Sequence, residues 1–279
     1  MKTQLNAIEY PNNSIDLAQN IRIHAIKMVT QSNSSHIGSS LSMADILAVL
    51  YMDILRVDPK QTDWPERDRF ILSKGHAAAG LYAALALRGF FPMVWLERFC
   101  QEGSLLMGHV SHHVPGVELS TGSLGHGLPV CCGLALAGKR QQSSYRVFVI
   151  LSDGECDEGS NWEAALFAAH HKLDNLVAIV DANKLQGFGH IEEVLALDPF
   201  AKKWDAFNWA VQEVDGHDHY ALRALLQRTP FESGKPSLLI AHTIKGKCVS
   251  FMEDQLAWHY KSPNPEQLSQ ALKQLGEKR

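Results

Sequence analysis

The chain has 279 residues, which is enough for one large α/β domain with a sizeable core. A hydrophobic fraction of 46% and a charged fraction of 20% are typical of globular domains and argue against a disordered or fibrous chain. The net charge is −4, so the chain lacks the excess of positive charge with which proteins bind the phosphate backbone of nucleic acids. We therefore expect no nucleic-acid partner. The 14 histidines are a large supply of the side chain best suited to proton transfer near neutral pH.

Helices dominate the first half of the predicted fold, where apolar residues recur at helical spacing over residues 15–32, 43–55, 76–88 and 124–140. The pattern then changes to short, β-branched apolar runs, which are typical of parallel strands buried on both faces: 146–151, 175–181, 209–215 and 237–243. Further helices are predicted over 161–173, 218–228 and 264–279. This alternation predicts an α/β fold with a doubly wound, mostly parallel sheet flanked by helices. No linker or repeat interrupts it, so we expect one domain over 1–279.

The spacing of the cysteines and the length of the apolar segments indicate the cellular compartment. The five cysteines form no CxxC pair, which argues against a zinc site and a disulfide framework. The N-terminal residues lack the apolar core of a secretory signal. The longest apolar stretch, 128–138, is too short to span a bilayer. We therefore expect a cytoplasmic protein without membrane contact.

Two polar loops follow neighbouring predicted strands at their carboxyl ends, where ligands bind in open parallel sheets. They are SDGECDEGSN (152–161) and DANKLQGFG (181–189). Asp153 and Asn183 would offer a carboxylate and an amide oxygen to one point, which suits Mg²⁺ held together with a diphosphate. The amide of Gly154 would lie near a helix start, where phosphate oxygens bind. The alternative is that both loops are ordinary turns, in which Asp-Gly and Asn are common.

The segment 152–186 resembles the thiamine diphosphate motif, which begins with Gly-Asp-Gly and ends downstream in Asn. Further segments are similar to transketolases: SSHIGSSLSMADILAVLY (34–51), LSKGHAAAGLYAAL (72–85), GH (108–109), PGVELSTGSLGHGL (115–128), VDGHD (214–218), HTIKGKCVSFMED (242–254) and WH (258–259). Because they follow one another in the family's order across nearly the whole chain, the protein is identified as a member of the transketolase family.

The resemblance implies thiamine diphosphate as cofactor, together with Mg²⁺ or with Ca²⁺ or Mn²⁺ in its place. The metal ligands would be the side chains of Asp153 and Asn183 and the backbone carbonyl of Leu185. The other residues that match cofactor contacts are His76, Gly122, Ser123, Leu124, Gly154 and His259.

The resemblance also implies catalytic roles for four residues. His36 and His109 match histidines that bind sugar hydroxyls or assist proton transfer, and His259 matches one that contacts phosphate or substrate. Glu158 matches an acid at the interface with a partner domain. Ser152 departs from the family by replacing the first glycine of the motif. The loop 108–116 lacks the usual Pro after His109, so its substrate contacts can differ.

A complete transketolase continues into a pyrimidine-binding domain and a C-terminal domain, which the resemblance places on a partner chain. We expect the diphosphate-binding subunit of a split transketolase, assembled as two copies of each chain. It would transfer a two-carbon ketol unit from a ketose phosphate to an aldose phosphate. The alternatives are a synthase of the 1-deoxyxylulose phosphate type, an enzyme of a specialised sugar pathway, and a non-catalytic subunit for cofactor binding or assembly.

Other features have plainer interpretations. Trp204 and Trp209 are expected in the core or an interface. Cys156 is expected to be structural, although a helix start beside it would favour a thiolate. Lys245 and Lys247 are either surface charges or contacts to the partner.

Overall fold

A computed structural model describes residues 11–277 of the chain. Two predictions fall partly outside the described residues. They are the absence of a secretory signal, which concerns residues 1–10, and the end of the helix predicted over 264–279.

A five-stranded sheet forms the centre of the fold, in the order β1-β2-β3-β5-β4, with every neighbouring pair parallel. Its strands are β1 (Arg69–Leu72), β2 (Val147–Ser152), β3 (Leu176–Ala182), β4 (Ala210–Asp215) and β5 (Ser237–His242). The last four match the predicted strands, so the α/β prediction is confirmed. The first was not predicted, because its four residues are too few to establish a period after the charged Arg67 and Asp68.

The register between β2 and β3 determines where the loops that follow these two strands begin. Strands β2 and β3 are apolar and buried along almost their whole length, as expected for strands covered on both faces. Their pairing runs from Val147 opposite Leu176 to Ser152 opposite Asp181. Both strands therefore end at the same level, and the loops that carry Asp153 and Asn183 leave the sheet side by side.

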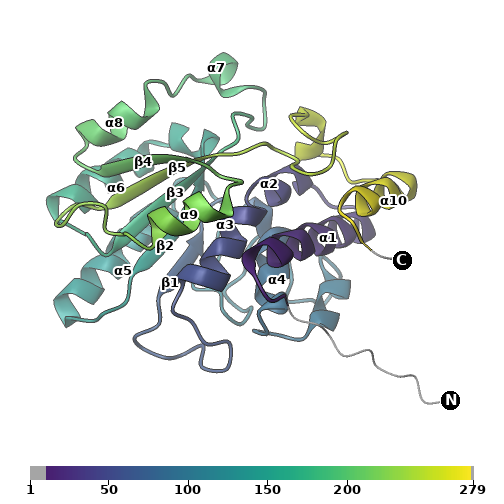
Figure 1. Cartoon of the computed structure of the whole chain (residues 1–279), viewed down its shortest axis with the longest axis horizontal. Helices are drawn as coiled ribbons and strands as arrows, with labels where there is room; N and C mark the ends of the chain where they lie inside the picture. The colour runs from purple at the N-terminus through teal and green to yellow at the C-terminus, as the bar shows by residue number, and fades with distance from the viewer. Residues whose placement is uncertain (1–10, 278–279) are drawn as a thin grey trace.

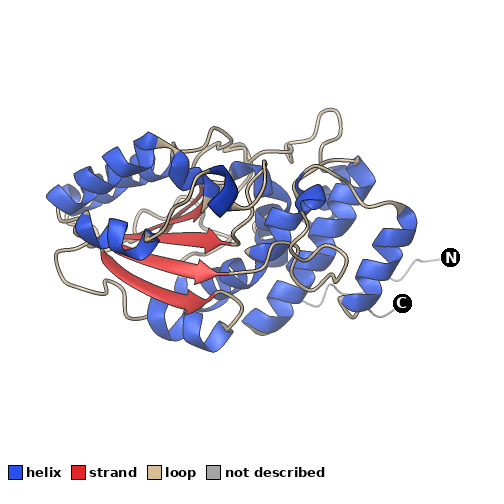
Figure 2. Cartoon of the chain, turned by 90° about the horizontal axis from the view of Figure 1, so that it is seen from above, coloured by secondary structure: helices blue, strands red, loops and turns tan. Residues whose placement is uncertain are grey.

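Helices cover both faces of the sheet, as Figures 1 and 2 show. One face packs against α5 (Gly127–Gln141), α6 (Gly159–His170) and α8 (Phe200–Ala206) around the buried Trp204 and Trp209. The other face packs against α3 (Ala44–Val49) and α9 (His219–Leu226), beyond which lie α1 (Ser14–Ser32) and α4 (Ala78–Leu87). The remaining α-helices described are α2 (Ile37–Ser42), α7 (Ile191–Val194) and α10 (Pro265–Gln274).

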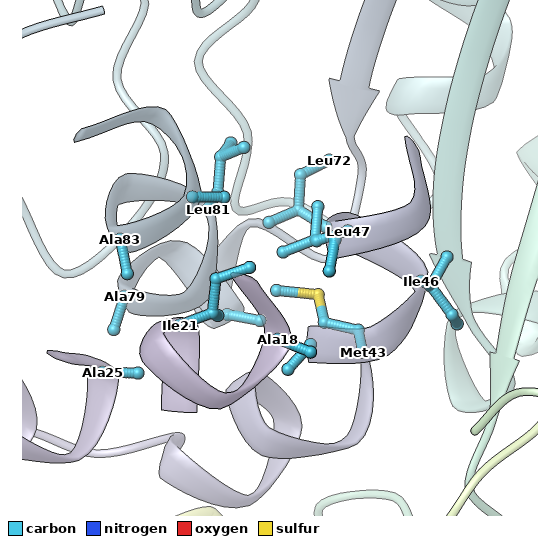
Figure 3. Close-up of a cluster of buried hydrophobic side chains, with 14 of the residues drawn as sticks. Ala18, Ile21, Ala25, Met43, Ile46, Leu47, Leu72, Ala79, Leu81 and Ala83 are labelled. Atoms are coloured by element: carbon cyan, nitrogen blue, oxygen red, sulfur yellow. The ribbon is translucent and has the colours of Figure 1, made fainter. Parts of the chain in front are cut away.

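The larger core lies where α1, α3 and α4 meet (Figure 3). Ile21, Met43 and Leu47 are fully buried there. Burial contributes about 1.5 to 3 kcal/mol for each such side chain. The sequence of α4, AAGLYAALAL, is rich in small residues, which lets α1 pack closely against it. This rigid helical block supports the segments that reach the sheet's carboxyl edge.

Several predicted helix boundaries were wrong. The helix predicted over 43–55 divides into α3 and a π-helical turn, Leu50–Ile54. The helix predicted from 124 begins at Gly127, because the residues before it form a loop. Short 3₁₀ turns occur at Gly75–Ala77, Met93–Arg98, Gly154–Asp157 and Leu256–His259. Within residues 11–277, no helix combines the length and apolar character needed to cross a membrane.

Candidate active site

A cavity of about 280 Å³ lies at the carboxyl ends of β2 and β3. Most of the predicted site residues line it: His36, His76, His109, Gly122, Leu124, Asp153, Gly154, Asn183, Leu185 and His259. Two do not, since Ser123 and Glu158 are exposed and absent from its wall. Glu158 instead precedes the first turn of α6 at the molecular surface.

Asp153 connects the two loops of the predicted metal site. Its Oδ1 accepts a hydrogen bond from the Gly154 amide at 2.8 Å, and its Oδ2 accepts one from the Lys184 amide at 2.6 Å. Burial, followed by the neighbouring charge of Asp181, raises the pKa of Asp153 to about 6 despite these amide donors. A divalent cation would supply the positive charge that this carboxylate lacks.

Asn183 is oriented by a hydrogen bond to the buried carboxylate of Asp181. Its Nδ2 donates to Asp181 Oδ2 at 3.3 Å, and its Oδ1 accepts from the Leu185 amide at 3.1 Å, so one lone pair of Oδ1 is left for a cation. Asp181 also accepts from Ser42 Oγ at 2.6 Å, from Lys74 Nζ at 2.5 Å and from Thr243 Oγ1. Burial alone would raise the pKa of Asp181, but the Lys74 ammonium and these hydroxyls hold it below its usual value.

These residues fit a divalent cation bound together with a diphosphate. Among residues 11–277, no three His, Cys, Asp or Glu side chains gather in a metal-binding arrangement. A cation here would therefore combine the oxygens of Asp153 and Asn183 with a backbone carbonyl and ligand oxygens, as Mg²⁺ commonly does. The carbonyl of Leu185 lies in the same wall and accepts from Lys245 Nζ at 2.6 Å.

The four histidines predicted for the site converge on this cavity. The ring centroid of His36 lies 5.0 Å from that of His76, 5.9 Å from that of His109 and 5.0 Å from that of His259. The centroids of His76 and His259 are 5.6 Å apart. The backbone of His36 has φ +71°, an uncommon conformation outside glycine, and its N–H donates to the carbonyl of His259 at 2.9 Å.

Burial keeps three of these imidazoles neutral. It lowers the pKa of His36 to about 4, assisted by His109 and the nearby lysines. It lowers the pKa of His259 to about 3, assisted by Lys245, and that of His76 well below the usual value. At pH 7 each ring therefore carries one N–H and one bare nitrogen. In His36 the Nδ1 atom lies 3.0 Å from Ser35 Oγ, which leaves Nε2 for a ligand.

The loop before α5 contributes Gly122 and Leu124 to the cavity wall and lies close to His109. A Cβ on Gly122 would lie 3.1 Å from His109 Cδ2, so a larger residue would push the imidazole. Leu124 supplies an apolar surface in the cavity wall. The arrangement thus combines an apolar loop, neutral imidazoles and an oxygen-rich end.

Sequence reasoning missed two buried lysines. Lys74 is fully buried, and Lys245 is 2% exposed, which contradicts a surface position for Lys245. Lys245 Nζ lies 2.9 Å from His259 Nδ1, and burial lowers its pKa to about 8. The usable signal was position, because Lys74 and Lys245 each follow a strand at the ligand-binding edge of the sheet.

A larger cavity of about 750 Å³ lies beside this one, between the segment 190–202 and the carboxyl halves of β3, β4 and β5. Of the predicted site residues, it contains Asp153 alone. The cysteine near the site, Cys156, is buried, and burial raises the pKa of its thiol well above the usual value. This environment agrees with the structural role predicted for Cys156.

Comparisons with known proteins point in one direction. The family model for "Transketolase, thiamine diphosphate binding domain" matches residues 14–278. An apulose-4-phosphate transketolase subunit from Actinobacillus succinogenes is 46% identical over 252 residues, covering 89% of this chain and 91% of that protein. The 6-deoxy-6-sulfo-D-fructose transketolase subunit SqwG of a Clostridium species is 40% identical, covering 91% of this chain and 93% of that protein.

Solved structures agree. Transketolase from Leishmania mexicana matches with a TM-score of 0.90 at 29% identity, covering 95% of this chain and 41% of that one. The Campylobacter jejuni enzyme matches with a TM-score of 0.85 at 31% identity, covering 93% of this chain and 42% of that one. The chain thus spans about two fifths of these single-chain enzymes. It belongs to the transketolase family and corresponds to the thiamine diphosphate binding domain of that family.

Proposed function

We propose that this chain is the diphosphate-binding subunit of a transketolase whose active site is completed by a second polypeptide. The observation that carries the proposal is the convergence of Asp153 and Asn183 with four histidines on one cavity at the carboxyl edge of the sheet. The cavity volume of about 280 Å³ is just below the range of about 300 to 1,000 Å³ for small-molecule pockets. A partner chain would supply the missing wall around the cofactor.

The metal end of the site would hold Mg²⁺, or Ca²⁺ or Mn²⁺, between Asp153, Asn183 and the Leu185 carbonyl. Gly154 and His76 lie in the same wall, where they would contact the diphosphate, and the buried ammonium of Lys245 would balance its charge. Thiamine diphosphate, when bound, would supply the carbon nucleophile that cleaves the ketose. Gly122 and Leu124, which line the cavity, would hold its rings.

The histidines would act on the sugar. The neutral rings of His36 and His259 each keep Nε2 for a sugar hydroxyl, because their Nδ1 atoms already contact Ser35 Oγ and Lys245 Nζ. His109 is exposed at the cavity mouth and would move a proton between sugar and solvent. The reaction would be transfer of a two-carbon ketol unit from a ketose phosphate to an aldose phosphate.

The assembly would contain two copies of each chain, because isologous pairing generates twofold symmetry. The exposed Glu158 would contribute at the interface with the partner. The free thiols of all five cysteines fit a reducing cytoplasm. The Actinobacillus and Clostridium relatives support a two-chain enzyme, since both are named as transketolase subunits and the alignments cover over nine tenths of their length.

The test is reconstitution with a candidate partner that contains pyrimidine-binding and C-terminal domains. Both chains, thiamine diphosphate and Mg²⁺ are mixed with a panel of ketose phosphates and aldose phosphates, and products are followed by mass spectrometry. We expect products that have gained two carbons, and none when this chain carries Asp153→Ala. A complex that binds cofactor and remains inert on the panel would contradict the catalytic proposal. Product from pyruvate and glyceraldehyde 3-phosphate would instead identify a synthase of the 1-deoxyxylulose phosphate type.

A further inference from the structure

Glu155 is a fully buried carboxylate, two residues after Asp153, that is not part of the cavity wall. Its Oε1 accepts hydrogen bonds from Ser73 Oγ at 2.5 Å and from the Gly125 amide at 2.9 Å. Its Oε2 accepts from the Ser152 amide at 3.2 Å. All three groups donate, so both oxygens of this carboxyl act as hydrogen-bond acceptors.

These bonds join segments that are far apart in sequence. Ser73 follows β1, Ser152 ends β2, and Gly125 belongs to the loop before α5. Ser73 Oγ also accepts from the Gly127 amide at 3.1 Å, so the same hydroxyl holds the first residue of that helix. A Cβ on Gly127 would lie 2.3 Å from Ser73 Oγ, so the start of α5 packs directly against Ser73 and only glycine fits there.

Asp153 and Glu155 are neighbours on one short turn, and they face different parts of the site. Asp153 contacts the loop after β3, at the metal end. Glu155 contacts the loop 122–125, which carries Gly122 and Leu124 into the cavity wall. The turn therefore fixes the spacing between the metal end and the apolar loop.

We propose that Glu155 is a positioning residue that sets the ring-binding loop 122–125 relative to the diphosphate anchor. The inference rests on the proposed cofactor site. Glu155 lies outside the cavity wall and would act through its bonds to Gly125 and Ser73. Its loss should weaken recognition of the cofactor's rings and leave recognition of its diphosphate nearly unchanged.

Glutamine is an informative replacement because it preserves shape. Its amide nitrogen would face either the Ser152 amide or the donors from Ser73 and Gly125, so one donor–donor contact is unavoidable. Alanine removes all the acceptors. We therefore expect Glu155→Ala to shift the loop more than Glu155→Gln does.

The test compares two probes by isothermal titration calorimetry with the full chain in Mg²⁺: inorganic pyrophosphate and thiamine diphosphate. The wild type should bind thiamine diphosphate more tightly, because its rings add contacts. In Glu155→Ala, pyrophosphate affinity should stay within about 3-fold, and thiamine diphosphate affinity should fall by about 10-fold or more, as expected when buried donors lose their acceptor. Glu155→Gln should show a smaller loss in the same direction.

Asp68→Asn is the matched control. Asp68 is also fully buried and accepts from the side chains of Arg56 and Arg146, but it precedes β1 at the opposite end of the sheet. This variant should unfold more easily and keep the wild-type ratio of the two affinities. Circular dichroism would verify folding in every variant.

The outcomes separate the two proposals. Failure of the wild type to bind either probe, alone or with its partner chain, would contradict the proposed function. Wild-type binding with an unchanged ratio in the Glu155 variants would overturn the role of Glu155, as would equal affinity of the wild type for both probes. If the Glu155 variants do not fold, Ser73→Ala decides, because it removes one donor and the Gly127 acceptor; an unchanged ratio there also overturns the inference.

Discussion

Replacing Lys74 by methionine would remove the cation of a buried ion pair beneath the cavity. Lys74 Nζ lies 2.5 Å from Asp181 Oδ2, and both side chains are 0% exposed. Methionine matches the unbranched shape of lysine, so the loss of charge dominates the change. The Asp181 carboxylate would keep hydrogen bonds from the hydroxyls of Ser42 and Thr243 and from the Asn183 amide, without its ion-pair partner.

The expected cost follows from that burial. Removing one partner of a buried ion pair typically costs about 3 to 5 kcal/mol, because the other charge stays in a medium of low polarity. The two remaining hydroxyl donors place our expectation near the lower limit, at about 3 kcal/mol. In a domain of 279 residues such a loss lowers Tm by about 5 °C.

Urea unfolding, followed by the fluorescence of the buried Trp204 and Trp209, measures the difference. Lys139→Met is the matched control, since Lys139 pairs with Asp174 at 2.7 Å but the side chains are 36% and 28% exposed. That variant should cost no more than about 1 kcal/mol. Equal costs for the two variants, or a cost below about 1 kcal/mol for Lys74→Met, would refute the reasoning from burial.

Two further predictions concern other buried charges. Burial raises the pKa of Asp45, but hydrogen bonds from His217 and Arg22 outweigh it and hold that pKa below its usual value. The resulting stability is present above the unfolded pKa of about 3.9 and is lost in acid, so Asp45→Asn should destabilise at pH 7 and match the wild type more closely at pH 3; an unchanged deficit in urea unfolding would contradict this. Lys245→Met should weaken Mg²⁺-dependent pyrophosphate binding by about 10-fold in calorimetry, whereas Lys247→Met, outside the cavity wall, should not; equal losses would exclude a specific role for Lys245.

The convergence of Asp153 and Asn183 could be predicted from sequence because it depends on local signals. Continuous apolar runs identify β2 and β3 as central parallel strands. Adjacent parallel strands end at a common edge, so the polar residues that follow them must meet there. Asp153 and Asn183 are placed by this rule alone, and the resemblance to transketolases implies what they would bind.

The supporting layer could not be predicted in the same way, because its partners are distant in the chain. Lys74 and Asp181 are 107 residues apart, and Ser73 and Glu155 are 82 residues apart. Periodicity describes the face on which a residue lies, and it contains no information about which distant group lies opposite. A lysine between a strand and a helix therefore looks the same in sequence whether it is solvated or buried in an ion pair.

The protonation state of the histidines could not be predicted from composition. Their residue type suggests groups that change protonation near pH 7, since an isolated imidazole has a pKa of about 6.5. Burial in the cluster instead holds His36 and His259 neutral across that range. Neutral imidazoles suit the binding of sugar hydroxyls better than proton storage. His109 differs from them in being exposed to solvent, so the proposed proton exchange with water would fall to it.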